Sequence, residues 1–316
     1  MKRVTLFIIV LIIANKGLQA QQRVTGGFPI DITEAPWQVY LSVGCGGSII
    51  APNFILTAKH CVEGRFPSAV TVSAGIRCRS EINSSNTFNV FQIILHPDPN
   101  IDAALLRLSS NITYNNNRQP VNYWSSVDNT LYNVGNETRV SGWGWTMPNN
   151  SNSTPNCLEA VNLNIISNQD ASNVLRPTWG RNLYTHEMAV TGNGNIRQGA
   201  CHGDSGGPLT ILTASNEPVL IGIVEGGIPG CSGDNQNSPS IFTRVSHIRN
   251  WIETLTCPTS NFTNQTITAN RTIAGCVINV QNVTVQNNAK LTIDATDLTT
   301  INGPFEVKLG SQLEIK

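Results

Sequence analysis

Short apolar runs separated by turn-forming residues leave this chain few choices of fold. Runs of strand-like composition alternate with segments rich in Pro, Gly and Asn, and they cover residues 37–41, 47–56, 70–74 and 88–95. No convincing amphipathic helix occurs before residues 245–255. Many short strands between such turns favour a barrel or a sandwich. The sequence therefore predicts an all-β domain closed by one C-terminal helix.

The N-terminus has the composition of a secretory signal peptide. Lys2 and Arg3 precede an apolar stretch, and residues 1–20 end at the small residue Ala20. The apolar stretch is shorter than the roughly 20 residues that span a membrane, so we expect no transmembrane segment. An uncut signal anchor is the weaker alternative. We therefore expect a secreted, extracellular protein whose eight cysteines form disulfides, because oxidising compartments keep cysteines paired.

The charge balance excludes two classes of partner. The chain carries 20 Lys and Arg against 20 Asp and Glu, and its pI is near 6.9. Such a chain has no basic field for nucleic acid or an anionic membrane. We therefore expect no nucleic-acid partner.

A second module begins after residue 257. An Asn- and Thr-rich linker leads there into four apolar–polar–apolar triplets, with the first pair and the last pair each eight residues apart: 283–285, 291–293, 305–307 and 313–315. Short strands at a fixed period predict a small β-solenoid, with an ordinary meander as the alternative. The module resembles short C-terminal β modules of secreted Bacteroidetes proteins, most clearly at residues 305–311.

Three segments carry residues suited to chemistry. His60 follows a predicted strand and precedes Cys61, and Asp102 stands at the head of an apolar run, where an unpaired carboxylate would be costly to bury. Each of the two alone has a structural reading, as a core histidine and as a turn cap. Ser205 lies among glycines in Cys-His-Gly-Asp-Ser-Gly-Gly-Pro at 201–208, where the backbone can turn tightly and expose N–H groups.

Together these segments resemble the chymotrypsin-like, trypsin-fold (S1-type) serine peptidases over residues 24 to 256. Further matches are Val-Thr-Gly-Gly at 24–27, Ala-Pro-Trp-Gln-Val at 35–39 and Val-Ser-Gly-Trp-Gly at 140–144. The order His, Asp, Ser along the chain is also the family's order. The resemblance implies two six-stranded antiparallel β-barrels with the active site between them, followed by the C-terminal helix.

The resemblance also implies the catalytic roles. Ser205 would attack the scissile carbonyl, His60 would move its proton, and Asp102 would orient the imidazole. The N–H groups of Gly203 and Ser205 would form the oxyanion hole. The substrates would be proteins or peptides, and the reaction requires neither a cofactor nor a metal. A calcium loop is not expected, because Ile76 stands where calcium-binding members carry a carboxylate.

Activation is expected to follow cleavage after Arg23. The freed α-amino group of Val24 would insert beside Asp204 and order the oxyanion loop, so residues 21–23 would be a short propeptide and 24–256 the peptidase domain. The pocket for the substrate side chain maps to Gly199, Gly227 and Ser240, which carry no charge. Because a buried cation needs a carboxylate partner, we expect cleavage after apolar residues and activation in trans by an Arg-specific protease.

Two departures from the family pattern lie behind Asp102. Lys59 replaces a small residue, and Glu225 stands where a Ser usually supports the aspartate. We hypothesise that Lys59 and Glu225 form a compensating ion pair, with a loop shift that exposes Glu225 to solvent as the alternative. Gly226 also stands where an aromatic residue is usual.

The resemblance implies the disulfides Cys45–Cys61 and Cys201–Cys231. Cys78 and Cys157 are then expected to join by default, and Cys257 and Cys276 to tie the linker to the tail. Residues 257–316 are expected to contact a cell surface or carbohydrate, to aid export, or to cap the domain. A catalytically impaired homologue that serves as a binding or adhesion module is the alternative reading of the whole chain.

Overall fold

The computed structural model describes residues 25–123, 126, 128–192, 198–228, 231, 238–257 and 259–316. The expected signal peptide at 1–20, the expected propeptide at 21–23 and Val24 lie outside these ranges. Within them, no helix combines the length and the apolar composition that crossing a bilayer requires.

Six antiparallel strands close the first barrel in the order β2-β3-β4-β7-β6-β5. They are β2 (Gln38–Leu41), β3 (Cys45–Ala51), β4 (Phe54–Thr57), β5 (Thr71–Ala74), β6 (Thr87–Leu95) and β7 (Ala104–Leu108). Their inward positions carry β-branched and aliphatic side chains, and Val39, Ile55 and Leu105 are fully buried. The apolar run predicted at 47–56 is two strands, because Pro52 and Asn53 form the turn between β3 and β4.

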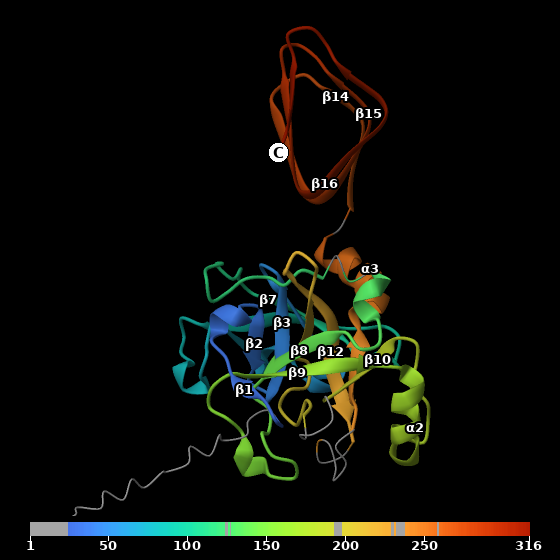
Figure 1. The fold of residues 1–316 in the computed structure, drawn as a ribbon. Helices are drawn as coiled ribbons and strands as arrows, with labels where there is room; N and C mark the ends of the chain where they lie inside the picture. Colours follow the sequence, from blue (N-terminus) through green and yellow to red (C-terminus); the bar gives the residue numbers. More distant parts are fainter. Residues whose placement is uncertain are drawn as a thin grey trace, which may run out of the picture.

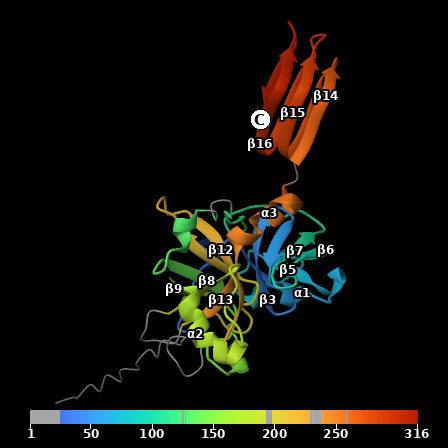
Figure 2. The same ribbon diagram turned by 90° about the vertical axis from the view of Figure 1, so that its right-hand side faces the viewer.

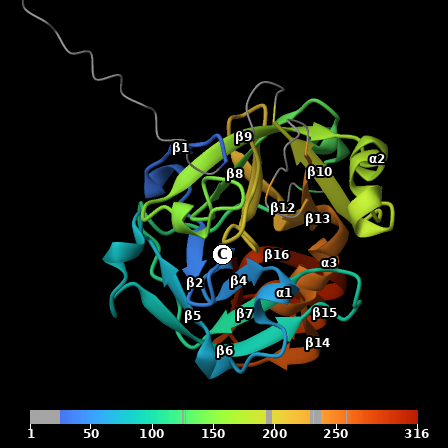
Figure 3. The same ribbon diagram turned by 90° about the horizontal axis from the view of Figure 1, so that it is seen from below.

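The second barrel is built from the strands that follow. β8 (Glu137–Gly142), β9 (Glu159–Ile166), β10 (Glu187–Thr191), β11 (Pro208–Leu212), β12 (Pro218–Gly227) and β13 (Ser240–Arg244) pair in the order β9-β10-β13-β12-β11-β8, and β8 pairs back to β9. β1 (Phe28–Pro29) adds to β9. Figure 3 shows the two sets of strands side by side. The expected all-β fold with two six-stranded antiparallel barrels is confirmed.

The described residues include three α-helices beside the strands of the barrels. The predicted C-terminal helix is α3 (Val245–Thr256), which buries Val245, Ile248 and Ile252. α1 (Lys59–Val62) and α2 (Asn168–Trp179) were not predicted. Short 3₁₀ turns lie at Ile32–Glu34, Pro67–Ala69, Arg79–Glu81, Asn129–Tyr132 and Ser151–Ser153.

The C-terminal module consists of parallel strands stacked in chain order. β14 (Thr259–Ile267), β15 (Arg271–Val285), β16 (Lys290–Val307) and β17 (Gln312–Ile315) form one sheet that lies beyond α3 (Figure 1 and Figure 2). Successive parallel strands that enclose an apolar interior are the architecture of a solenoid. The triplets predicted to repeat every eight residues are not successive coils. Val283 pairs with Phe305 and Leu291 pairs with Leu313, so the coil here is 22 residues long.

Four disulfides are formed among the described cysteines. They are Cys45–Cys61, Cys78–Cys157, Cys201–Cys231 and Cys257–Cys276. Cys45–Cys61 ties β3 to α1, and Cys78–Cys157 joins the two barrels. Cys257–Cys276 joins the end of α3 to β15. These are the pairs expected from the sequence.

Candidate active site

His60 is held in place by two hydrogen bonds to one carboxylate. It lies in α1, directly after β4, and Asp102 lies just before β7, the strand that pairs with β4. The backbone N–H of His60 donates to Asp102 Oδ1 at 2.8 Å, and His60 Nδ1 lies 2.6 Å from Asp102 Oδ2. This contact fixes the ring orientation, and the hydrogen bond to Asp102 raises the pKa of the imidazole above its usual 6.5.

The loop that carries Ser205 docks on the first barrel beside His60. Gly206 has φ +77°, and a side chain there would meet Gly46 O and the backbone N of Ala58. Gly46 N–H in turn donates to Ser205 O at 2.8 Å. Because β3 pairs with β4, these contacts bring Ser205 to the end of the strand that precedes His60.

His60 and Ser205 line one cavity of about 410 Å³. Asp102 stands behind His60, on the side away from Nε2. Among the described atoms, the Ser205 hydroxyl makes no hydrogen bond to the imidazole, and the Cys61 sulfur lies 3.7 Å from Nε2. The structure therefore brings the three residues of the expected triad to one site, with the Asp–His hydrogen bond formed and the Ser–His hydrogen bond not formed.

Two backbone N–H groups beside Ser205 are available to bind an oxygen. Within the described part of the chain, the N–H groups of Gly203 and Ser205 have no acceptor. The carbonyl of His202 accepts from Trp145 N–H at 2.8 Å. A trans peptide points its N–H opposite to its C=O, so this bond fixes the direction of the Gly203 N–H. Gly203 adopts φ +100°, which favours glycine at this position.

Asp204 is a fully buried carboxylate next to this loop. It accepts hydrogen bonds from Gly144 N–H at 2.8 Å and Cys201 N–H at 2.9 Å. Burial raises its pKa to about 6. None of the described Lys, Arg or His side chains forms an ion pair with it. A Cβ on Gly142 or Gly144 would collide with the carboxylate, which explains the glycines there. Arg23 and Val24 lie outside the described residues.

The expected side-chain pocket is lined by neutral groups. Gly227 and Ser240 line the 410 Å³ cavity together with Ala200, Val224, Ile228 and Pro239. Gly199 lies behind Ser240, where a Cβ would come within 2.9 Å of Ser240 Oγ. Ser240 Oγ accepts from Ala200 N–H at 3.1 Å. Among the described residues that line this cavity there is no lysine, arginine or aspartate, and Glu225 is the single carboxylic residue.

The hypothesis of a Lys59–Glu225 ion pair is wrong. Lys59 Nζ donates instead to the carbonyl of Asp98 at 2.7 Å, on the first barrel. Glu225 belongs to β12, at an irregularity in its register with β13, and an extra residue there changes which way a side chain points. Its carboxylate contacts Thr243 Oγ1 at 3.1 Å. The alternative, in which Glu225 points to solvent, is also wrong, because its carboxyl group is desolvated.

Three residues that the sequence analysis missed lie beside the site. Arg181 forms a two-pronged pair with the buried Glu187, with Nη1–Oε2 and Nη2–Oε1 distances of 2.9 and 2.5 Å. Trp179 Nε1 donates to Gly227 O at 3.2 Å, and its ring lies 3.8 Å from the position of a Cβ on Gly226. The adjacent glycines of β12, Gly226 and Gly227, were the sequence signal, because they leave room for a bulky side chain from another element.

One cluster contains residue types that bind metals, but its cysteines are not free to act as ligands. Ligand atoms of Cys45, His60 and Cys61 lie within 4.8 Å of one another. Both sulfurs are in a disulfide, so neither is the thiolate that a metal would bind.

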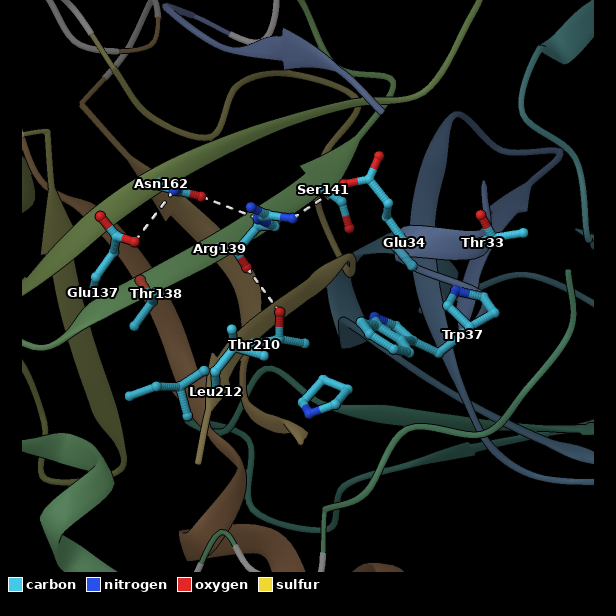
Figure 4. Close-up of a pocket in the computed structure, with 14 residues that line it drawn as sticks. Thr33, Glu34, Trp37, Glu137, Thr138, Arg139, Ser141, Asn162, Thr210 and Leu212 are labelled. Carbon is cyan, nitrogen blue, oxygen red and sulfur yellow. Dashed lines mark hydrogen bonds and ion pairs between the residues drawn. The ribbon is translucent and has the colours of Figure 1, made fainter. Parts of the chain in front are cut away.

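A second cavity of about 440 Å³ lies where the segment 33–37, which precedes β2, meets β8, β9, β11 and β12 of the second barrel, and none of the triad lines it (Figure 4). Its charged groups bind one another. Arg139 lies 3.5 Å from Glu34 and donates to Asn162 Oδ1 at 3.1 Å, and Asn162 also contacts Glu137. The guanidinium therefore already has partners.

Known proteins resemble this chain over the two barrels. The family model described as Trypsin matches residues 24–252. Transmembrane protease serine 11G of Rattus norvegicus and of Mus musculus are each 33% identical over 244 residues, which is 74% of this chain and 55% of each relative. The chain thus spans about half the length of these relatives. The family match ends before β14.

Proposed function

The chain belongs to the trypsin family of serine peptidases, and from that premise we propose that it is an active endopeptidase with His60, Asp102 and Ser205 as its triad. One observation carries the proposal: an imidazole oriented by a carboxylate shares a cavity with a serine beside two N–H groups that have no acceptor among the described residues.

The proposed reaction passes through an acyl-enzyme. His60 Nε2 removes the Ser205 proton as Oγ attacks the peptide carbonyl, and the resulting oxyanion is bound by the N–H groups of Gly203 and Ser205. His60 then protonates the leaving amine, and water repeats the sequence to release the acid. Asp102 stabilises the imidazolium at each step. Binding of substrate would have to shorten the Ser205–His60 separation, as is common between free and occupied sites.

The substrate preference follows from the lining of the cavity. A pocket with Gly227 and Ser240 on its walls and Gly199 behind them offers no carboxylate at its base, so apolar side chains are the preferred occupants. The test is a peptide-library cleavage profile of protein first cut at Arg23, with Ser205→Ala as the control. Cleavage after Leu, Met, Phe or Tyr that is lost in the control supports the proposal, and preferential cleavage after Arg or Lys contradicts the pocket assignment.

A designed change tests the pocket base directly. Gly199→Asp made with Ser240→Gly places a carboxylate at the base and removes the hydroxyl that would crowd it. We expect preference for Arg and Lys to rise by at least about tenfold, as each 1.4 kcal/mol of pairing energy gives a factor of ten. An unchanged profile would show that Gly199 does not face the substrate side chain.

We infer activation by cleavage after Arg23. The support is Asp204, a buried carboxylate without a cation among the described residues, which the α-amino group of Val24 would pair with. Because the pocket is neutral, an Arg-specific protease should act in trans. Incubation of purified uncut protein, followed by N-terminal sequencing, checks this, and rapid self-cleavage at Arg23 would refute it.

A catalytically impaired binding module is the second candidate. The missing Ser205–His60 hydrogen bond and the acidic Glu225 behind Asp102 favour it. A fluorophosphonate that reacts with activated serines separates the two functions: protein cut at Arg23 should be labelled at Ser205, and a binding module should not.

We also propose a cellular location for the protein and a role for residues 257–316. The signal-like residues 1–20 and the four disulfides support a secreted, extracellular protein. Residues 257–316 would then form a separate β module that attaches the peptidase to a cell surface or to carbohydrate. Comparing the adsorption of the full chain and of residues 24–256 to cells and to polysaccharide tests that role.

A further inference from the structure

A chain of polar contacts runs from β10 to the backbone of Asp102. The carboxyls of Glu187 and Glu225 are in hydrogen-bonding contact. Glu225 Oε2 lies 3.1 Å from Thr243 Oγ1, and Thr243 Oγ1 lies 3.1 Å from the carbonyl oxygen of Asp102. Glu225 is thus connected to the backbone of the aspartate that orients His60.

If every carboxyl beside this series of polar contacts is ionised, negative charges outnumber positive ones. The groups facing Glu225 are Glu187 on β10, Asp102 before β7, Thr243 on β13, and Arg181 in the loop after α2. Together with Glu225 itself, these groups include three carboxyls and one cation. Lys59 is directed to Asp98 O and does not contribute.

The one cation is already engaged by Glu187. Arg181 binds both carboxylate oxygens of Glu187, and Tyr184 N–H donates to the same group at 2.5 Å. These contacts stabilise the ionised form of Glu187, whose side chain is fully buried. Two buried carboxyls in contact cannot both ionise without a large repulsion, so the proton stays on Glu225.

Counting hydrogens gives the same answer. Three contacts link Glu187, Glu225, Thr243 and the Asp102 carbonyl, and the carbonyl can only accept. A neutral Glu225 and the Thr243 hydroxyl supply two hydrogens, so two of the three contacts are hydrogen bonds. An ionised Glu225 leaves one hydrogen, sets two carboxylates face to face, and draws the Thr243 hydrogen away from Asp102.

We propose that Glu225 is a positioning residue that acts as a neutral carboxylic acid: its own hydrogen binds the ionised Glu187, which leaves the Thr243 hydrogen for the Asp102 carbonyl. This proposal rests on the peptidase function proposed above, whose triad Glu225 supports through Thr243. Burial and the charge of Glu187 raise the pKa of Glu225 to about 8, so the residue is mainly neutral at pH 7 and ionises in the alkaline range.

The sign of the pH dependence follows. As the pH rises through the pKa of Glu225, the contact chain loses a hydrogen and Asp102 gains an unpaired negative neighbour. The catalytic constant kcat should therefore fall across that range, while KM changes little, because Glu225 supports the triad rather than the substrate. Glutamine has the shape of the neutral acid, donates to Glu187 through its amide and cannot ionise.

Three variants test the inference in protein cut at Arg23. We expect Glu225→Gln to keep kcat/KM at pH 7 within about threefold and to remove the alkaline transition assigned to Glu225. Glu225→Ala should lose about 10²-fold in kcat at all pH values, the scale of a misplaced catalytic group. Glu187→Gln removes the repelling charge and frees Arg181, so the transition should move to lower pH, which a purely structural role would not produce.

A direct measurement separates this inference from the peptidase proposal. In ¹³C-Glu-labelled Ser205→Ala protein, the Glu225 carboxyl resonance, assigned by its absence in Glu225→Gln, should titrate above pH 7. If the wild-type protein hydrolyses peptides but this carboxyl is ionised at pH 7, or if Glu225→Gln is as damaging as Glu225→Ala, the inference is wrong. If no peptide is cleaved although Glu225 titrates above pH 7, the peptidase proposal fails and the protonation assignment stands.

Discussion

Before cleavage at Arg23, the stability of the protein should depend on pH because of Asp204, and changing Asp204 to asparagine should remove that dependence. Asp204 is fully buried with two N–H donors, and burial raises its pKa to about 6 from an ordinary 3.8. Between these pH values the folded chain binds more protons than the unfolded chain. Stability therefore falls as the pH rises through that window, and the loss is complete above the folded pKa.

The magnitude follows from the two pKa values. Their difference multiplied by 1.36 kcal/mol per pH unit gives about 3 kcal/mol lost between pH 4 and pH 7. An asparagine has no such dependence. Its amide group would face either Gly144 N–H or Cys201 N–H as a second donor, which adds a cost of about 1–3 kcal/mol that does not vary with pH. The pH slope is therefore the quantity to compare.

Urea unfolding of uncut Ser205→Ala protein, with and without Asp204→Asn, measures the effect at pH values from 4 to 8. As the pH rises, the protein that keeps Asp204 should lose about 3 kcal/mol of unfolding free energy relative to the Asp204→Asn protein. After cleavage at Arg23, pairing with the α-amino group of Val24 should reduce or reverse that shift. A difference that stays flat between pH 4 and pH 7 in the uncut protein would refute the reasoning.

Three further predictions concern other parts of the domain. Asp102→Asn removes the hydrogen bond that raises the pKa of the triad imidazole, so kcat should fall about 10⁴-fold and the acid limb of the kcat/KM profile should move to lower pH. Gly144→Ala should destabilise the protein to urea by at least about 1–3 kcal/mol, because its Cβ collides with the buried carboxylate, whereas Gly226→Ala, whose nearest neighbour is 3.8 Å away, should be tolerated. Replacing Cys78 and Cys157 together by serine opens a link between residues 79 apart and should cost about 4 kcal/mol of unfolding free energy in urea, with kcat/KM unchanged in a peptide assay. A stable but inactive double variant would show that the bridge positions the triad.

Local pattern accounts for much of the fold, and its failures have identifiable causes. The strands and α3 follow from short apolar runs and from the spacing of Val245, Ile248 and Ile252. α2 escaped prediction because its buried face is only Ala171, Ser172 and Leu175, and because it contains Pro177. In the tail, the eight-residue spacing of triplets lies within a coil, so the true repeat appeared only once the strands were paired.

The sequence by itself determined the candidate triad and the glycine loop, since a motif such as Gly-Asp-Ser-Gly-Gly-Pro fixes which backbone can turn and which N–H groups are exposed. What surrounds the triad was decided only by the tertiary structure. Lys59 and Glu225 have opposite charges and map to neighbouring positions, yet each meets a different partner, Asp98 O and the Glu187–Thr243 pair. The reason is physical: protonation and pairing of a buried charge depend on desolvation and on groups contributed by distant strands, and neither is encoded in the residues adjacent to it along the chain.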